Sequence, residues 1–511
     1  MLAWSGELPV SLARAYQEMA SLTLYAVAHA PRLQTIAVTT HAWHDAGATA
    51  VQELGFALAT GVEYLRALAT RGIAIDDAAP RVRFALSAGS NVFMEIAKLR
   101  AARVVWAQAV RALGGSDAAS ALHLHVRTAT FNKTVYDAHT NILRGTTEAF
   151  AAIIGGCDSL HVGPFDEVAR PPDEFGRRLA RNTQIILAEE CDLARVIDPA
   201  GGSYYIEWLT NEVAQRAWSL FQEMEKAGGM ARALAAGVPQ KLVAETAQIR
   251  ADAVARRRTV IVGMNQYPSN REGAPDRKLP DYAAIQQKRA KQVAAFRTAC
   301  APEADAEVLD RLATLLNSQP ADALEAAIAA ALQGATLGEI ARTLRADDGP
   351  ATRVPPVRVH RASQPFEKLR DASARWKTLH GKPPLLFQAN IGPSRLYRLR
   401  ADWTTGFFEV GGFKVAADRD YKDANEAVAA ALASGARVVV ITAMDETYAT
   451  VVEPLARALK GQDPGLIVLV AGLPKENEAA WRAAGVDEFV NVASNCLELL
   501  TRLLAKIGVL S

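Results

Sequence analysis

The stretch from Thr39 to Gly61, TTHAWHDAGATAVQELGFALATG, constrains the fold more than any other part of the chain. An apolar, β-branched run at residues 35–40 precedes it. A helical pattern follows it, with apolar residues on one stripe at Val51, Leu54, Leu58, Val62 and Leu65. A strand, a short polar turn and a helix form the unit from which parallel barrels and wound sheets are built. The sequence therefore predicts a parallel α/β fold, with chemistry expected in the turns after the strands.

The turn itself holds His41 and His44 beside Asp45, the residue types of an acid/base pair with an orienting carboxylate. The plainer interpretation is that these are ordinary loop residues and that Asp45 caps the following helix. No nearby residue completes a catalytic site, so the residues alone favour the plainer interpretation.

The composition is that of a globular chain. Of 511 residues, 50% are hydrophobic and 22% are charged, which suffices for two or three domains. A net charge of +2 gives no reason to expect a nucleic-acid partner. The cysteines are far apart and form no CxxC pair, which argues against a zinc site or a disulfide framework: Cys157, Cys191, Cys300 and Cys496. The start lacks a signal-peptide pattern and no apolar run reaches the ~18 residues of a membrane span, so we expect a cytoplasmic protein.

Four strand–helix units follow a helix at residues 10–30. The predicted strands are Thr35–Thr40, Val82–Ser87, Leu122–Thr128 and Ser159–Val162, and the predicted helices are Ala48–Thr70, Asn91–Leu113, His139–Ile154 and Asp173–Glu190. This alternation implies a parallel sheet with right-handed crossovers, and the apolar run near Phe84 predicts burial on both faces. Four units are half of an eight-stranded barrel and leave two unpaired edges. We therefore expect either an open sheet or a first half that lies upstream.

Polar residues mark the start of the predicted helix at 91–113. Ser90 or Asn91 is expected to cap it, and Glu95 can form ion pairs with Lys98 and Arg103.

A polar loop, with Asn132, Lys133 and Tyr136, follows the predicted strand Leu122–Thr128. A barrel places its active site in such loops, although plain loop structure is the favoured interpretation here.

The remaining chain divides by composition. Residues 208–345 are rich in alanine and charge and are predicted to be helical, and residues 346–384 carry proline and basic residues typical of a linker. Residues 385–511 again alternate strands with helices, the strands being Leu385–Gln388, Phe413–Ala416, Arg437–Ile441, Leu466–Ala471 and Glu488–Asn491. This pattern predicts a flavodoxin-like wound sheet at 385–511, after a first domain at 1–207.

Several phrases resemble the methylmalonyl-coenzyme A mutase family. They are DAGATA at 45–50, FMEIAKLRAAR at 93–103, RRLARNTQIILAEE at 177–190 and DPAGGSYYIE at 198–207. The resemblance implies that residues 1–207 are the C-terminal half of a (β/α)8 TIM barrel, because family members carry more barrel upstream. It also implies that the N-terminal part, which threads coenzyme A through the barrel, is missing.

The family's catalytic subunits read GYHxxEAGAT at the turn described above, and the histidine is the acid beside the substrate thioester. An ungapped match places Ala42 at the position of that histidine, His41 at the tyrosine, and His44 two residues further on. A methyl group cannot donate a proton, so the resemblance implies the family's small, non-catalytic subunit.

Residues 385–511 resemble the cobalamin-binding domain of B12-dependent mutases, whose DxHxxG motif supplies a histidine ligand to cobalt. Without gaps, that motif falls on residues 395–400, so Tyr397 replaces the histidine. The family's later serine and paired-glycine motifs fall at Thr442 and at Ala471-Gly472. The resemblance implies a scaffold without cofactor-binding residues and without a metal ligand.

A large catalytic subunit would then bind adenosylcobalamin and the acyl-CoA and interconvert methylmalonyl-CoA and succinyl-CoA. Two other interpretations stay open. The chain could itself be a catalytic acyl-CoA mutase that uses His41 or His44 as the acid, or it could be a non-enzymatic assembly or regulatory protein. Neither a nucleic acid nor a membrane is expected among its partners.

Overall fold

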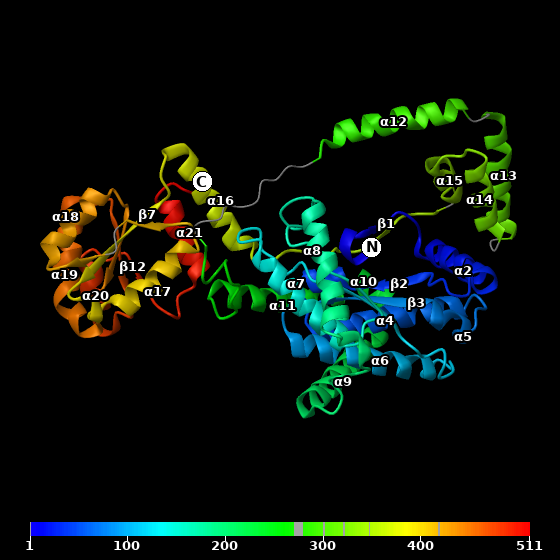
Figure 1. Cartoon of the computed structure of the whole chain (residues 1–511), viewed down its shortest axis with the longest axis horizontal. Helices are drawn as coiled ribbons and strands as arrows, with labels where there is room; N and C mark the ends of the chain where they lie inside the picture. Colours follow the sequence, from blue (N-terminus) through cyan, green and yellow to red (C-terminus); the bar gives the residue numbers. More distant parts are fainter. Residues whose placement is uncertain are drawn as a thin grey trace. The chain divides into compact units, whose positions relative to one another are not determined.

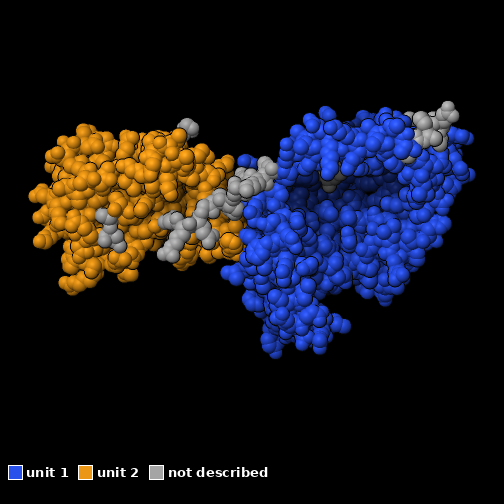
Figure 2. Space-filling model, turned by 45° about the horizontal axis from the view of Figure 1, so that its top comes forward, with its two compact units in different colours: residues 1–131, 142–247, 276–360 blue, residues 132–141, 248–275, 361–511 orange. Residues whose placement is uncertain are grey.

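The computed structural model describes residues 2–269, 280–299, 302–319, 322–346, 348–416 and 419–510. The chain forms two compact units, each assembled from segments far apart in the sequence (Figure 2). Unit 1 contains residues 1–131, 142–247 and 276–360, and unit 2 contains residues 132–141, 248–275 and 361–511. No helix within the described ranges is both long and apolar enough to cross a membrane.

A parallel sheet lies at the centre of unit 1. Its strands pair in chain order: β2 (Ile36–Thr39), β3 (Val82–Ala88), β4 (His123–Thr128) and β5 (Ser159–His161). These are the four strands predicted from the sequence, and their parallel pairing confirms the α/β class.

Helices precede, alternate with and follow these strands, and those from residue 204 on come after the last strand of the sheet. In chain order they are α1 (Leu2–Ser5), α2 (Leu12–His29), α3 (His41–Asp45), α4 (Ala50–Ala69), α5 (Ile75–Ala78), α6 (Val92–Ala112), α7 (Thr140–Ile154), α8 (Glu174–Ile185), α9 (Tyr204–Lys226), α10 (Met230–Ala235), α11 (Val238–Ala255), α12 (Tyr282–Ala299), α13 (Pro302–Ser318), α14 (Ala323–Leu332) and α15 (Leu337–Leu344). A π-helical turn, Ile186–Glu190, continues α8, and 3₁₀ turns lie at Ala79–Arg81 and Leu193–Arg195.

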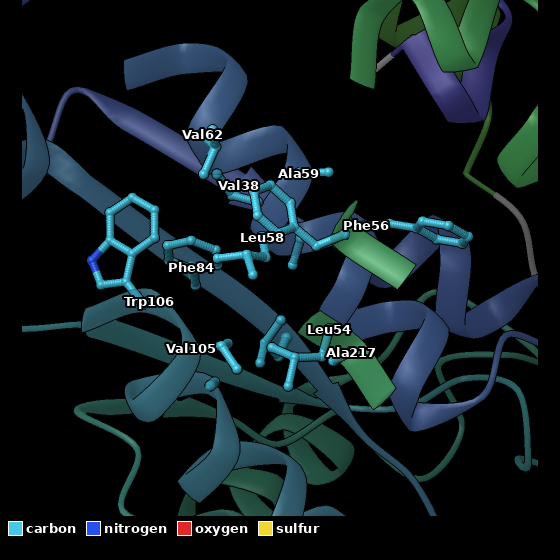
Figure 3. Close-up of a cluster of buried hydrophobic side chains, with 14 of the residues drawn as sticks. Val38, Leu54, Phe56, Leu58, Ala59, Val62, Phe84, Val105, Trp106 and Ala217 are labelled. Carbon is cyan, nitrogen blue, oxygen red and sulfur yellow. The ribbon is translucent and has the colours of Figure 1, made fainter. Parts of the chain in front are cut away.

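Helices α4 and α6 pack against one face of the sheet, and α9 packs on both of these helices (Figure 1). The rings of Phe84 and Trp106 meet edge to face at 4.8 Å in this core (Figure 3). A Cβ atom on Gly61 of α4 would come within 2.8 Å of Trp106 and 2.9 Å of Phe84, so only glycine fits there. Helix α4 starts at Thr49, which forms a capping box with Gln52.

The opposite face of the sheet is polar. Side chains on that face are exposed or half-buried: Arg83 on β3, His123, His125 and Arg127 on β4, and His161 on β5. The predicted burial on both faces is confirmed for the apolar run of β3, where Phe84 on one face and Ala85 on the other are both buried. It does not extend to the polar positions named above. Alternation along β4 places Leu124 and Val126 against the helices and the histidines on the other side.

A second parallel sheet lies in unit 2. Its strands are β7 (Leu385–Ile391), β8 (Lys414–Val415), β9 (Asp420–Tyr421), β10 (Val438–Thr442), β11 (Ile467–Ala471) and β12 (Glu488–Val490). Their order is β12-β11-β10-β7-β8, and β9 also pairs with β7. In chain order this is the 2-1-3-4-5 arrangement of wound sheets. The helices are α16 (Gln364–His380), α17 (Arg398–Glu409), α18 (Ala424–Ser434), α19 (Asp445–Gln462), α20 (Glu478–Ala483) and α21 (Cys496–Lys506), with 3₁₀ turns at Ser394–Leu396 and Lys475–Asn477.

Residues 346–384 differ from the linker that their composition suggested. The described part contains β6 (Thr352–Arg353), which pairs antiparallel with β1 (Glu7–Leu8), and the whole of α16. Phe366 and Leu369 of α16 are buried in the core of unit 2. Cys300 lies outside the described residues.

Candidate functional site

The candidate site lies at the carboxyl ends of β2 and β3, where α3 follows β2 directly. Parallel α/β folds place their chemistry at this edge. The sequence-predicted residues His41, Ala42, His44 and Asp45 all lie on α3.

Glu53, in the first turn of α4, is the centre of the site and is completely buried. One carboxylate oxygen accepts from the Thr40 hydroxyl at 2.6 Å and from the Ser87 backbone N–H at 2.9 Å. The other lies 2.7 Å from Lys98 Nζ and 3.0 Å from His44 Nδ1. Burial alone would raise the pKa of Glu53, but Lys98 and His44 outweigh it and hold that pKa well below its usual range.

Lys98 of α6 is the matching buried cation. Its ammonium group also donates to the Ser87 carbonyl at 2.6 Å and lies 2.5 Å from Glu95. Burial opposes the charged form, yet Glu53 and Glu95 together raise the pKa of Lys98. The predicted Glu95–Lys98 ion pair is therefore present. The predicted pair with Arg103 is absent among the described contacts, since Arg103 donates to the carbonyls of Leu99 and Gly155 instead.

His44 is buried, and the carboxylate that orients it is Glu53 rather than its neighbour Asp45. Burial would lower the pKa of His44, but the charge and hydrogen bond of Glu53 raise it overall. Gly89 covers the other side of the ring, because a Cβ atom there would lie 3.1 Å from His44 Nε2 and 3.2 Å from Glu95 Oε1. The imidazole is thus enclosed between Glu53 and the Gly89 backbone.

His41 is half-buried, and its Nδ1 lies 2.9 Å from the Ser87 hydroxyl. Burial lowers the pKa of His41 to about 4, so its imidazole is neutral at pH 7. Ala42 is partly buried and packs against the core of unit 1.

Asp45 does not cap α4, which corrects the plainer interpretation of the turn. Its carboxylate accepts from the Thr130 hydroxyl at 2.6 Å and from the Phe131 N–H at 3.1 Å, while Thr49 caps the helix. Asp45 thus ties the turn after β2 to the turn after β4.

The other sequence-predicted polar residues have structural contacts. Asn91 caps α6 by accepting from the Met94 N–H at 3.2 Å. Tyr136 donates to Asp371 at 2.7 Å within unit 2, and Lys133 is buried there. Among the described residues, no group of three His, Cys, Asp or Glu side chains is arranged to hold a metal ion.

The edge of the second sheet contains Tyr397, Thr442 and Gly472. Tyr397 is buried, and its hydroxyl donates to Asp420. Thr442 ends β10, and its hydroxyl contacts the side chain of Asn390. Gly472 follows β11, and a Cβ atom there would lie 3.1 Å from the ring of Tyr448.

Tyr448 fills the space between the ends of β10 and β11. Its hydroxyl donates to the Ala471 carbonyl at 2.6 Å and accepts from the Ala443 N–H at 3.2 Å. Arg400 lies over its ring at 5.1 Å and donates to the Ala443 carbonyl at 2.7 Å and to Asp445 at 2.8 Å. Arg400 belongs to α17, which follows β7, and it contacts Ala443, which follows β10, so its side chain lies at the point where the strand order reverses and where wound sheets bind ligands.

The segment at residues 361–511, which forms the second sheet, contains a single histidine. Of the 9 histidines, only His380 lies within residues 361–511. His380 precedes β7, so it lies toward the amino end of that strand, and its ring stacks on Trp376 at 3.6 Å. The carboxyl edge thus offers no imidazole from these residues.

The chain thus combines a parallel α/β unit, which has a buried polar site at its strand ends, with a wound sheet. Comparisons with known proteins show the family to which it belongs. The family model described as methylmalonyl-CoA mutase matches residues 2–350. The chain is 35% identical over 472 residues to a methylmalonyl-CoA mutase of Rhizobium meliloti, covering 90% of this chain and 66% of that one.

Two relatives come from Porphyromonas gingivalis. The methylmalonyl-CoA mutase small subunit is 34% identical, and the match covers 91% of this chain and 64% of the small subunit. The large subunit is 30% identical, and that match covers 92% of this chain and 67% of the large subunit. The chain belongs to the methylmalonyl-CoA mutase family. It spans about two thirds of the length of these relatives.

Proposed function

We propose that this chain is the small, non-catalytic subunit of a heterodimeric methylmalonyl-CoA mutase. In this proposal a homologous large subunit binds the acyl-CoA and adenosylcobalamin, supplies the catalytic acid, and is stabilised by this chain. Relatives named small and large subunits occur together in Porphyromonas gingivalis and in Streptomyces virginiae, which supports a pair of homologous chains.

The observation that carries the proposal is the environment of Ala42. Its methyl group cannot act as an acid, and neither neighbouring histidine is suited to replace it. His44 is enclosed between Glu53 and Gly89, and His41 has a pKa of about 4. A general acid works best when its pKa lies near the operating pH.

The proposal assigns the sheet of unit 1 to half of a TIM barrel and unit 2 to a cobalamin-binding type of domain that has lost its ligand motif. The residues at the edge of that sheet do not fit the histidine-ligated cofactor. Tyr397 donates its hydroxyl to Asp420, and Arg400 donates to the Ala443 carbonyl at the point between β7 and β10 where the strand order reverses.

Two measurements on the purified chain test the proposal. Mutase turnover should be undetectable for the chain alone and present with the large chain, and His41→Ala should leave kcat of the pair within about twofold, whereas losing an acid typically costs about 10² to 10⁴. The visible spectrum of cobalamin should be unchanged by the chain. Turnover by the chain alone that disappears in His41→Ala or His44→Gln would instead identify a catalytic mutase.

A further inference from the structure

Exposed aromatic side chains gather where α9 begins beside α6. We call Phe93, Tyr204, Tyr205, Trp208 and Ile197 the aromatic surface. Their exposed fractions are 55%, 95%, 52%, 57% and 97%. The Phe93 and Tyr205 rings meet edge to face at 5.7 Å, and the Tyr205 and Trp208 rings stack at 6.1 Å. The neighbouring helices α6 and α9 bring Phe93 beside the others, although it lies about a hundred positions before them in the sequence (Figure 1).

The aromatic surface is as large as the largest apolar patch of a typical monomer, and such patches often mark an interaction site. An aromatic side chain offers roughly 150–250 Å², so the four rings alone leave roughly 500 Å² of ring surface in water. The largest apolar patch of a typical monomer is roughly 300–600 Å² in total, and a standard interface buries roughly 800 Å² on each partner. The four rings alone therefore supply more than half of the area that one side of such an interface buries.

The aromatic surface is also held rigid. Arg100 of α6 donates from Nε and Nη2 to the two carboxylate oxygens of Asp198, each at 2.8 Å. Its guanidinium group also donates to Glu207 at 2.9 Å and to the Thr210 hydroxyl at 3.1 Å. Glu207 in turn accepts from the Gly202 N–H at 2.9 Å. These contacts fix the loop before α9 against the two helices, so a partner would order little when it binds.

We propose that the aromatic surface is the docking site for the large mutase chain, an inference that rests on the proposed function. Tyrosine, tryptophan and phenylalanine dominate the centres of protein interfaces, whereas charged residues surround them. The chain matches relatives named large and small subunits over nearly the same share of its length, so its partner would have the same fold. Homologous chains can pair about a pseudo-twofold axis in which each presents the corresponding surface.

The experiment measures binding of the full chain to the purified large chain by sedimentation velocity. Replacing a central aromatic residue of an interface commonly weakens binding by roughly 30-fold or more. We expect that loss for Tyr205→Ser combined with Trp208→Ser. Tyr204→Glu should weaken binding similarly, and this side chain is too exposed for the charge to disturb folding. Tyr282→Ser on α12, which replaces a residue 60% exposed, is the matched control and should bind like the unaltered chain.

Each outcome has a separate meaning. Weakened binding by both aromatic-surface variants, with the control unchanged, supports the docking site. Equal binding by all variants overturns the docking site and leaves the proposed function standing. Failure of the unaltered chain to bind overturns the proposed function and this inference with it. A self-association of the chain alone that disappears in Tyr204→Glu would show that a second copy, rather than the large chain, occupies the surface.

Discussion

Replacing Lys98 by methionine removes the cation that lies against both Glu53 and Glu95 in the buried site. Breaking a buried ion pair by removing one partner costs about 3–5 kcal/mol, because the remaining charge is left uncompensated. His44 still contacts Glu53, so we expect about 3 kcal/mol at pH 7. With a urea m-value near the upper end of its usual range, this lowers the midpoint of unfolding by roughly 1 M.

The loss should depend on pH. In the unaltered chain the pKa of Glu53 is depressed, so its stabilisation is present above its unfolded pKa, about 4.3, and is lost as pH falls through the folded value. In Lys98→Met, Glu53 loses its closest cation and burial raises its folded pKa, so the variant loses stability as pH increases above about 4.3. The difference between variant and unaltered chain should therefore be small at pH 4 and largest near pH 8.

Urea unfolding followed by near-UV circular dichroism measures this loss, and hydrogen exchange of peptides from β3 assigns it to unit 1. Arg111→Met is the matched control, because Arg111 and Asp117 form an exposed ion pair at 2.6 Å, and such pairs contribute about 0–1 kcal/mol. A cost for Lys98→Met that equals this control, or that does not change with pH, would refute the assignment of Lys98 as the cation on which both carboxylates depend.

Two further measurements examine the same site. Gly89→Ala should destabilise the chain by about 1–3 kcal/mol, because its new Cβ atom presses on His44 and Glu95. The control is Gly406→Ala in α17, whose Cβ atom meets open space and which should stabilise the chain by up to about 1 kcal/mol. Thermal unfolding compares the two variants. The ring protons of His41 should titrate in NMR spectra with a pKa of about 4, and because this pKa is lowered by folding, stability should fall as pH drops from about 6.5 toward that value. A His41 titration near pH 6.5 would show that the ring is solvated.

The sequence predicted the strands well because each is a short apolar or alternating run bounded by turn residues. The register of β3 against β4, for example, follows from the alternation in His123–Thr128. Helix α16 was missed because its proline and basic residues resemble a linker. Its start did carry a signal, Pro365 in the first turn, and its end another, Gly381 in a left-handed conformation.

The buried site could be predicted only in part. His41, His44 and Asp45 could be predicted as candidate site residues because they are close together in the sequence. The residue at the centre of the site, however, is Glu53. Glu53 meets Lys98 across 45 positions of sequence, and no spacing rule connects residues so far apart. An acidic residue in the first turn of a helix also reads as an ordinary surface residue. The contacts of such a site become visible only when the sheet brings α4 and α6 together.

Unit 2 is formed by segments that lie far apart in the sequence, and this affects when it can fold during synthesis. Its core takes Tyr136, Val254, Ile261 and Met264 from the middle of the sequence, together with the helices and strands after residue 361. On the ribosome these four side chains emerge long before the sheet that will bury them, so unit 2 cannot close until synthesis is nearly finished. Unit 1 has its sheet complete by His161 and can begin to fold far earlier. A gene fragment cut at residue 385 would accordingly yield a wound sheet with part of its core exposed to water.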